Sequence, residues 1–348
     1  MLITTTEYFF LFILTYGIVG ALTPVMRKIA ISRKILDQPI SAHKSHKIAV
    51  PYLGGIAILI GVVFVSYLAL IFSGLTLSNF LLASSVLAPA VLMGLIGLWD
   101  DIKNLPPFPR FAGQSMAGII VAVVLIMTNN VANPTGSTAI DMFLTLFWVV
   151  GICNSINFFD NLDGGAAGTT AVSAIFLACI AIEGKQSFVA ALSIVIAGAT
   201  LGFLIWNKVP ARIYMGDAGA LFLGVLIATL TIRLKPLTES TIASFATPLL
   251  LLAIPILDTS VAVFSRLIRG ISPFVGGRDH LSHRLIRIGL QRKFTAILLW
   301  LFSALFGLVA LVINLKFKNY DFFILLGSLV FWISLFMFFI RIPSSDKP

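Results

Sequence analysis

FLLASSVLAPAVLMGLIGLWDD, residues 80–101, contains no charged side chain before its two final aspartates. An uncharged apolar run of about 20 residues has the length of a helix that spans the hydrocarbon core of a bilayer. Similar runs follow one another along the chain, separated by short polar segments. The composition agrees, at 59% hydrophobic and 11% charged residues with a mean hydropathy of +1.03. A soluble domain could not bury that much apolar surface, so the sequence predicts a membrane protein.

We expect an all-α polytopic membrane protein with about 11 transmembrane helices, forming one integral membrane domain over residues 1–348. The span at 217–232 is short, which leaves a tilted or partly interfacial placement open. The predicted spans are roughly 7–26, 53–73, 80–99, 111–128, 139–157, 164–183, 188–206, 217–232, 243–264, 294–315 and 321–340.

The basic residues predict the orientation. No Lys or Arg precedes the first span, and Arg27 and Lys28 follow it, which argues against a signal peptide. The positive-inside rule then places the N-terminus outside and the C-terminus in the cytoplasm. With eleven alternating spans, most of the 24 Lys and Arg residues are cytoplasmic. The net charge of +10 is therefore explained by topology and by attraction to anionic lipid, without a nucleic acid partner. The basic residues expected on the outer side are Lys185, Arg233, Lys235, Lys316 and Lys318.

The Asp, Asn and His residues show the same asymmetry. Clusters of these residues fall at the predicted cytoplasmic ends of the spans, and the outer loops carry no comparable cluster. We expect one site at the cytoplasmic membrane surface, built from several loops. These loops cover about 27–52, 100–114, 154–168, 207–217 and 265–293.

Asp100 and Asp101 end the third predicted span. The C-terminal end of a helix carries partial negative charge, so two adjacent carboxylates are disfavoured there unless a cation is near. Mg²⁺, Lys103 or Arg110 would offset the repulsion. The alternative is an ordinary solvated turn.

YMGDAGALFLG (214–224) opens the eighth predicted span. Here the helix dipole has the opposite sign, and Gly216 and Gly219 would let a ligand approach the backbone. The N-terminus of this helix could receive a phosphate, with Asp217 holding a metal shared with it. The alternative is that Asp217 is a plain N-cap.

Three further segments add polar groups. In GGRDHLSHRLIRIG (276–289), helical spacing would place His280, His283, Arg284 and Arg287 on one face, as cationic donors for a polyanion or as a lipid-surface helix. HKSHKIAVPYLGG (43–55) is open to the same two interpretations. In CNSINFFDNLDGG (153–165), Asn154, Asn157 and Asn161 share a face if the fifth span continues as a helix.

Hard oxygen ligands together with Lys, Arg and His are typical of a Mg²⁺–diphosphate site. Because the site is expected at the bilayer surface, one substrate would be a lipid and the other a water-soluble nucleotide.

Five motifs carry a family resemblance. PYLGG, WDDIKN, NSINFFDNLDG, FLIWNKVPARIYMGDAG and GRDHLSHRL occur in this order between about residues 37 and 291. The chain resembles the polyprenyl-phosphate N-acetylhexosamine-1-phosphate transferases of glycosyltransferase family 4, and within them the bacterial WecA-like branch. The resemblance implies transfer of N-acetylglucosamine 1-phosphate from UDP-GlcNAc to undecaprenyl phosphate, giving undecaprenyl-pyrophosphoryl-GlcNAc and UMP. This reaction initiates a cell-envelope polysaccharide. Another UDP-N-acetylhexosamine or UDP-MurNAc-pentapeptide remains the alternative donor.

The resemblance also implies Mg²⁺, with Mn²⁺ as a substitute, and a multi-pass protein of the inner (cytoplasmic) membrane whose active site faces the cytoplasm. It assigns the metal to Asp217 and Asn157 and the catalysis to Asp100, Asp101 and Asp217, with Asp100 deprotonating or orienting the lipid phosphate. The implied substrate-binding residues are His46, Lys47, Lys103, Arg110, Asn154, Asp160, Asp163, Asn207, Arg278, His280, His283 and Arg284.

The motifs depart from the family pattern at three places. Ala220 replaces a Ser, Asn161 stands where many members have Gly, and the third His of the commoner His-x-His-His motif is missing.

Other mechanisms and functions stay open on the sequence. A covalent aspartyl-phosphate intermediate is an alternative to direct attack by the lipid phosphate. A transporter for an anionic substrate and a membrane prenyltransferase are rival functions, and the family resemblance leaves room for a homodimer. The transporter would need ionisable residues near span centres, where the sequence offers only Asp258, close to a span end.

Overall fold

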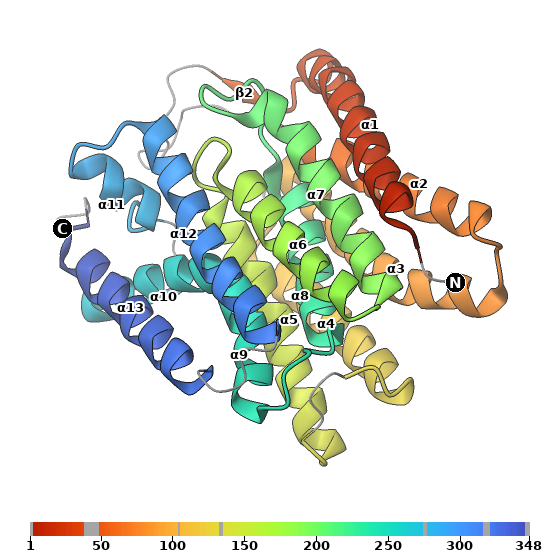
Figure 1. Ribbon diagram of the computed structural model, residues 1–348. Helices are drawn as coiled ribbons and strands as arrows, with labels where there is room; N and C mark the ends of the chain where they lie inside the picture. The colour runs from red at the N-terminus through yellow and green to blue at the C-terminus, as the bar shows by residue number, and fades with distance from the viewer. Residues whose placement is uncertain are drawn as a thin grey trace.

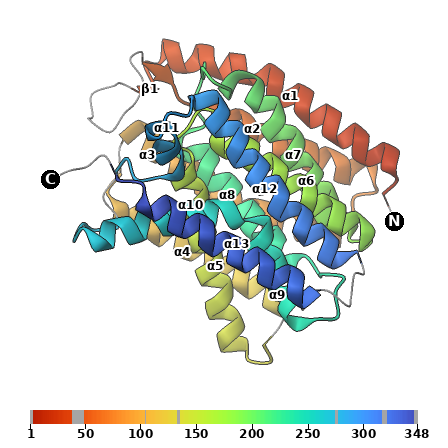
Figure 2. The same cartoon turned by 60° about the vertical axis from the view of Figure 1, so that its left-hand side comes forward.

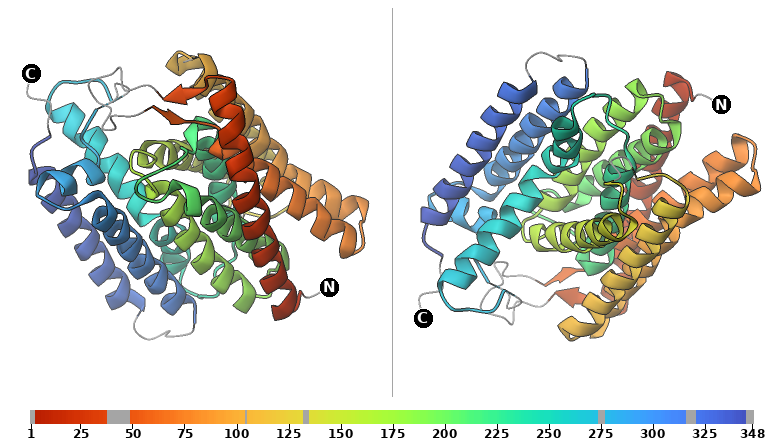
Figure 3. Two further views of the ribbon diagram at one scale, coloured as in Figure 1. Left: turned by 90° about the horizontal axis from the view of Figure 1, so that it is seen from above. Right: turned by 90° about the horizontal axis from the view of Figure 1, so that it is seen from below.

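The computed structural model describes residues 3–37, 49–103, 105–131, 135–273, 277–315 and 321–344. In these residues ten helices are long and apolar enough to cross a membrane, and a bent pair of helices gives an eleventh span. The predicted all-α polytopic fold is thereby confirmed. Seen along the bundle, α12 and α13 form one edge and α2 and α3 the opposite edge (Figure 3). The helices are α1 (Thr5–Ser32), α2 (Gly54–Phe72), α3 (Leu77–Lys103), α4 (Pro107–Met127), α5 (Thr138–Phe159), α6 (Gly165–Glu183), α7 (Ser187–Asn207), α8 (Gly216–Arg233), α9 (Thr241–Leu251), α10 (Ala253–Ile268), α11 (Leu281–Arg287), α12 (Arg292–Asn314) and α13 (Asp321–Arg341).

Helix α8 forms the centre of the bundle. It is the most buried of the spanning helices, and it packs mainly against α3 and α5. A partly interfacial placement of this short segment is therefore wrong, because neighbouring helices rather than lipid surround it. A short helix is sufficient at this position because other helices surround α8. It therefore needs no lipid-facing side that extends from one membrane surface to the other.

Glycines allow α2 and α3 to approach the first turn of α8. A Cβ atom on Gly55 would collide with the backbone of Gly219, and one on Gly97 would collide with the carbonyl group of Asp217. The N–H groups of Gly54 and Gly55 donate to the carbonyl oxygens of Tyr214 and Met215, at 3.0 and 2.9 Å. These contacts fix the backbone that leads into α8.

The predicted ninth span, 243–264, is broken into α9 and α10, whose axes differ by 74° (Figure 2). The prediction of one continuous helix is wrong at this point. Pro255 has no N–H group to bond the carbonyl oxygen of Leu251, and the Ser173 hydroxyl group donates to that oxygen instead, at 2.7 Å. The Trp332 indole donates to the carbonyl oxygen of Ala253 at 3.1 Å. Neighbouring helices thus satisfy the carbonyl groups that the break exposes.

A small pair of antiparallel strands, β1 (Leu36–Asp37) and β2 (Val50–Pro51), lies outside the predicted helices. β2 and the short helix α11 lie toward one end of the molecule, and α9 lies toward the other (Figure 1). The end with β2 and α11 also receives the last turns of α3, α5 and α7 and the first turn of α8, and it is called the pocket end below.

The close contact at Gly97 yields a stability prediction. Gly97→Ala should destabilise the protein by about 1–3 kcal/mol, because the new methyl group overpacks the backbone at the start of α8. Gly17→Ala in α1 is the matched control, since nothing lies within 4 Å of its added Cβ. Thermal unfolding in detergent measures both variants, and equal midpoints would contradict the packing described for α8.

Candidate active site

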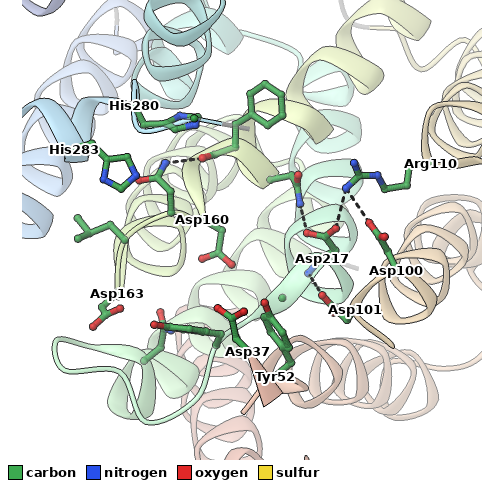
Figure 4. Close-up of a pocket in the computed structure, with 18 of the residues that line it drawn as sticks. Asp37, Tyr52, Asp100, Asp101, Arg110, Asp160, Asp163, Asp217, His280 and His283 are labelled. Carbon is green, nitrogen blue, oxygen red and sulfur yellow. Dashed lines mark hydrogen bonds and ion pairs between the residues drawn. The ribbon is translucent and has the colours of Figure 1, made fainter. Parts of the chain in front are cut away.

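An open cavity of about 520 Å³ lies at the pocket end. It brings together residues from the ends of α3, α5 and α8, from α4, from positions 37 and 52, and from the segments around 207–216 and 277–292 (Figure 4). The predicted site residues that line it are Asp100, Asp101, Arg110, Asn157, Asp160, Asp163, Asn207, Asp217, His280 and His283. The structure thus brings these predicted residues to one cavity, and their roles in a site stay a prediction.

Asp101 of α3 caps the N-terminus of α8. Its carboxylate accepts the N–H groups of Asp217 at 2.9 Å and Ala218 at 3.1 Å. Gly216 precedes them with φ +71°, and a Cβ atom there would collide with this carboxylate. These N–H groups are therefore engaged, so the expected phosphate position on the α8 N-terminus is wrong. Gly219 contacts Gly55 instead of opening toward a ligand.

Asp217 lies at the centre of the polar network and does not cap its own helix. Its Oδ1 atom accepts from the Asn157 amide at 2.7 Å, and its Oδ2 atom accepts from Arg110 at 3.1 Å. The same Nη1 atom of Arg110 donates to Asp100 at 2.8 Å. The other oxygen of Asp100 accepts from the N–H group of Leu105 at 2.6 Å. One guanidinium group thus bridges a carboxylate of α3 and a carboxylate of α8.

Asp160 lies between this network and the opposite wall of the cavity (Figure 4). No side chain in the described parts of the chain hydrogen-bonds to its carboxylate. Burial, followed by the charges of Asp217, Asp101 and Asp163, raises the pKa of Asp160 well above its usual range. Six aspartates line the cavity, and Arg110 bridges two of them. An added cation would relieve the repulsion among these carboxylates.

The donor chemistry of this group fits a divalent cation held partly by substrate. Among the described residues, no cluster of three or more His, Cys, Asp or Glu side chains could enclose a metal ion. Mg²⁺ commonly uses only one or two carboxylates and completes its shell with phosphate and water. Asp217 supplies one such carboxylate, and the amide group of Asn157 lies beside it in the cavity.

His280 and His283 form the wall across the cavity from Asp217 (Figure 4). Helix α11 does form, with His280 as its N-cap residue. Burial, followed by the charge of the neighbouring His280, lowers the pKa of His283 to about 4. His283 is therefore neutral at pH 7 in the substrate-free protein and does not carry the positive charge that was expected of it. Asn161, one of the departures from the family pattern, accepts a hydrogen bond from Ser282 and links the end of α5 to α11.

Asp163 and Asn207 organise the loop between α7 and α8. Asp163 accepts the N–H group of Ala211 at 3.0 Å. The Asn207 amide accepts from Gly164 at 2.9 Å and donates to the carbonyl oxygen of Ile213 at 3.0 Å. Asn207 is buried and uses both ends of its amide internally. Asn207 thus stabilises the backbone that borders the cavity, and its amide has no unbonded group directed at a ligand.

Other predicted substrate-binding residues lie away from the cavity. The Asn154 amide pairs with Gln114 of α4 at 2.7 Å, because α4 packs against α5, the helix that carries Asn154. Arg284 is buried, and it donates to the carbonyl oxygens of Asp279 at 2.7 Å, Phe339 at 2.8 Å and Ile342. A role for Arg284 in clamping the diphosphate is therefore wrong. Lys103 is exposed at the end of α3, and neither it nor Arg278 lines the cavity. His46 and Lys47 lie outside the described residues.

Several cavity residues escaped the sequence-based site: Asp37, Tyr52, Tyr214 and Arg292. Tyr52 and Tyr214 lie within the quoted PYLGG and YMGDAG motifs, and their ring centroids are 6.2 Å apart. Burial raises the pKa of both phenols, so both carry their proton at neutral pH. Both tyrosines thus lie inside motifs that the sequence made visible. The predicted site contained only charged, amide and imidazole side chains, and so it left them out.

Comparison with known proteins gives consistent matches. The model of glycosyl transferase family 4 matches residues 83–235. The probable undecaprenyl-phosphate N-acetylglucosaminyl 1-phosphate transferase of Bacillus subtilis is 32% identical, over 95% of this chain and 88% of its own length. The decaprenyl-phosphate N-acetylglucosaminephosphotransferase of Mycobacterium leprae is 31% identical, over 86% and 80%.

A third relative matches over a shorter region. The phospho-N-acetylmuramoyl-pentapeptide-transferase of Streptococcus agalactiae is 30% identical over 54% of this chain and 61% of its own length. The matched family model covers α5, α7 and α8, which carry Asn157, Asn207 and Asp217. The chain therefore belongs to glycosyl transferase family 4 and is a membrane-embedded sugar-phosphate transferase.

Proposed function

We propose that this protein transfers N-acetylglucosamine 1-phosphate from UDP-GlcNAc to undecaprenyl phosphate, with release of UMP. The relatives named for N-acetylglucosamine transfer match this chain over 95% and 86% of its length. The relative named for muramoyl-pentapeptide transfer matches over 54%. This difference favours the GlcNAc donor over UDP-MurNAc-pentapeptide. Family membership removes the transporter and the prenyltransferase as candidate functions.

The observation that carries the proposal is the position of Asp217. Three helices other than its own bring a side chain against its carboxylate or the N–H group of its backbone: Asn157 from α5, Arg110 from α4 and Asp101 from α3. Phosphoryl transfer needs positioned charge far more than covalent chemistry from the protein. A rigid carboxylate beside an amide and a guanidinium group supplies that charge.

The side chains of this chain divide into three roles. Asp217 and Asn157 would hold Mg²⁺, for which Mn²⁺ is the natural substitute. When bound, the ion supplies charge neutralisation for the diphosphate and the departing UMP. Arg110, whose side chain is 32% exposed, would meet phosphate oxygens from the solvent side of Asp100. Asp101 acts by holding the first turn of α8 in place.

Asp100 fits an orienting role better than a nucleophilic one. Both of its oxygens already accept hydrogen bonds, from Leu105 and Arg110. We therefore propose direct transfer: an oxygen of undecaprenyl phosphate bonds to the β-phosphorus of the UDP-sugar. The bond from that phosphorus to the bridging oxygen breaks, and UMP leaves with the electron pair. The Asp100–Arg110 pair would align the attacking phosphate.

We also propose that the pocket end faces the cytoplasm of a bacterial cell. Most of the Lys and Arg residues fall in the segments assigned to that side, in keeping with the positive-inside rule. UDP-sugars are cytoplasmic metabolites that do not cross a bilayer unaided, so this orientation also supplies the donor.

Removing the Asp217 carboxylate tests the site. Asp217→Ala should abolish UMP release, since the metal and Arg110 both lose their partner, while the protein still purifies folded in detergent. Asp141→Ala is the control, because among the described residues this carboxylate binds the N–H group of Thr135 near the start of α5, away from the cavity. UMP release with undecaprenyl phosphate and Mg²⁺ is the measurement. Near-normal turnover of Asp217→Ala would contradict the assignment of the metal to Asp217.

A panel of donors tests the substrate. Purified protein with undecaprenyl phosphate and Mg²⁺ should release UMP fastest from UDP-GlcNAc among UDP-N-acetylhexosamines and UDP-MurNAc-pentapeptide. Mass spectrometry should find undecaprenyl-pyrophosphoryl-GlcNAc as the lipid product. Preference for another donor would overturn the sugar, and failure with every donor would overturn the reaction.

His283 yields a pH prediction for the substrate-free protein. Its folded pKa of about 4 lies below the ordinary value of 6.5, so the unfolded chain binds the proton more readily. The stability that His283 contributes is complete above about pH 6.5 and is lost as the pH falls toward 4. His283→Asn should therefore lose less thermal stability than the wild type between pH 7 and 4.5. Parallel pH profiles of the two thermal midpoints would contradict the buried neutral state.

A further inference from the structure

A fully buried carboxylate lies behind His280. Asp258 of α10 is 0% exposed, and its Oδ2 atom lies 2.7 Å from the Nδ1 atom of His280. Its Oδ1 atom accepts the N–H group of Leu281 at 2.7 Å. Both oxygens are therefore directed at one end of α11, and Asp258 does not line the cavity. Within the described ranges, the side chain that hydrogen-bonds to it belongs to His280, which does line the cavity.

This contact decides which ring nitrogen of His280 carries a proton. An ionised carboxylate only accepts hydrogen bonds, so a short contact to Nδ1 requires a proton on Nδ1. In the neutral ring, Nε2 is then an acceptor. The Nη2 atom of Arg266 lies 3.4 Å from Nε2, and the carboxylate of Asp279 lies 3.9 Å from it. His283 lies beside the ring, with the two imidazole centroids 6.1 Å apart.

The segment that carries His280 has other anchors. Asp279 pairs with Arg266 through two hydrogen bonds of 2.8 Å, and with Arg269 at 2.8 Å. Arg284 holds the carbonyl group of Asp279 and the end of α13. The backbone is thus fixed without the bond from His280 to Asp258. That bond adds control of the imidazole ring itself.

The broken span explains how a membrane helix reaches this ring. Asp258 lies about one and a half turns into α10, after the 74° bend that separates α10 from α9. The His280 ring lies at the cavity edge, with its neighbour His283, across from the Asp217 network (Figure 4). The bend at Leu252 and Pro255 therefore determines where the carboxylate behind His280 is placed.

We propose that Asp258 is a positioning residue of the active site: it fixes the Nδ1–H tautomer of His280, leaves Nε2 as the acceptor that faces Arg266, and thereby holds the ring in the wall of the cavity that would receive the UDP-sugar. In the neutral ring Nε2 accepts a hydrogen bond, and after protonation it donates one. The catalytic consequence rests on the proposed function, whereas the tautomer does not.

Asp258→Asn is the discriminating variant. The asparagine oxygen can still accept the N–H group of Leu281, but its amide nitrogen would donate to Nδ1 and force the proton onto Nε2. Arg269→Gln is the matched control, because it weakens the anchoring of Asp279 in the same segment and does not touch His280.

The tautomer is read from nitrogen spectra of ¹⁵N-histidine-labelled full-length protein, with His280→Gln assigning the signal. The wild type and Arg269→Gln should show Nδ1–H, and Asp258→Asn should show Nε2–H. Asp258→Asn should also lose about 10- to 100-fold in kcat/KM, the range found when a carboxylate that orients a metal-bound histidine is removed. Arg269→Gln should lose thermal stability but keep kcat/KM within about threefold, a range set by additivity between separate sites.

Each outcome decides the proposal. An Nε2–H tautomer in the wild type overturns it, and that measurement stands even if Asp258→Asn fails to fold. An inverted tautomer with unchanged kcat/KM overturns the positioning role, as does lost activity with an unchanged tautomer. If the wild type transfers no sugar phosphate, the proposed function fails while the spectra still decide the tautomer.

Discussion

The carboxylate of Asp101 on the first turn of α8 is the contact on which the site depends. It joins the end of one spanning helix to the beginning of another by two backbone hydrogen bonds. Gly97 and Gly216 leave the room that this contact requires. Because the backbone of Asp217 is one of the two donors, its side chain is placed by the same bonds. A sequence that changed any of these positions would move the central carboxylate of the cavity.

This arrangement also concentrates negative charge. Asp100, Asp101, Asp160 and Asp217 line one cavity, and Arg110 bridges only two of them. Hydrogen bonds from backbone N–H groups satisfy part of Asp100 and Asp101, but Asp160 has no such partner among the described residues. Burial, followed by the charges of these neighbouring carboxylates, raises the pKa of Asp160. A substrate that arrives with a divalent cation brings the charge that this group of residues lacks.

The sequence was sufficient for the number of spans and for about half of the residues that line the cavity. A long apolar run that crosses a bilayer must satisfy its own backbone hydrogen bonds, and a helix does so. Composition and length therefore predict helices well. Asp100, Asn157 and Asp217 were found because polar groups at span ends are rare enough to stand out. Arg284 and Asn154 were misjudged for a physical reason: their partners are a backbone carbonyl group of α13 and a side chain of α4. Such pairings depend on packing between distant segments. The break before α10 had a local signal in Pro255, but the Ser173 bond that makes the break tolerable came only from the structure.

The central position of α8 has a consequence for how the protein is made. Of the ten spanning helices in the described residues, α8 is both the least apolar and the most buried. Its first turn ends in protein contacts rather than at a lipid surface. A segment of this kind gains less from partitioning into lipid by itself than the more apolar spans do. The helices that precede α8 in synthesis can offset the difference, so α2, α3 and α5 would act as its insertion site before they act as the scaffold of an enzyme.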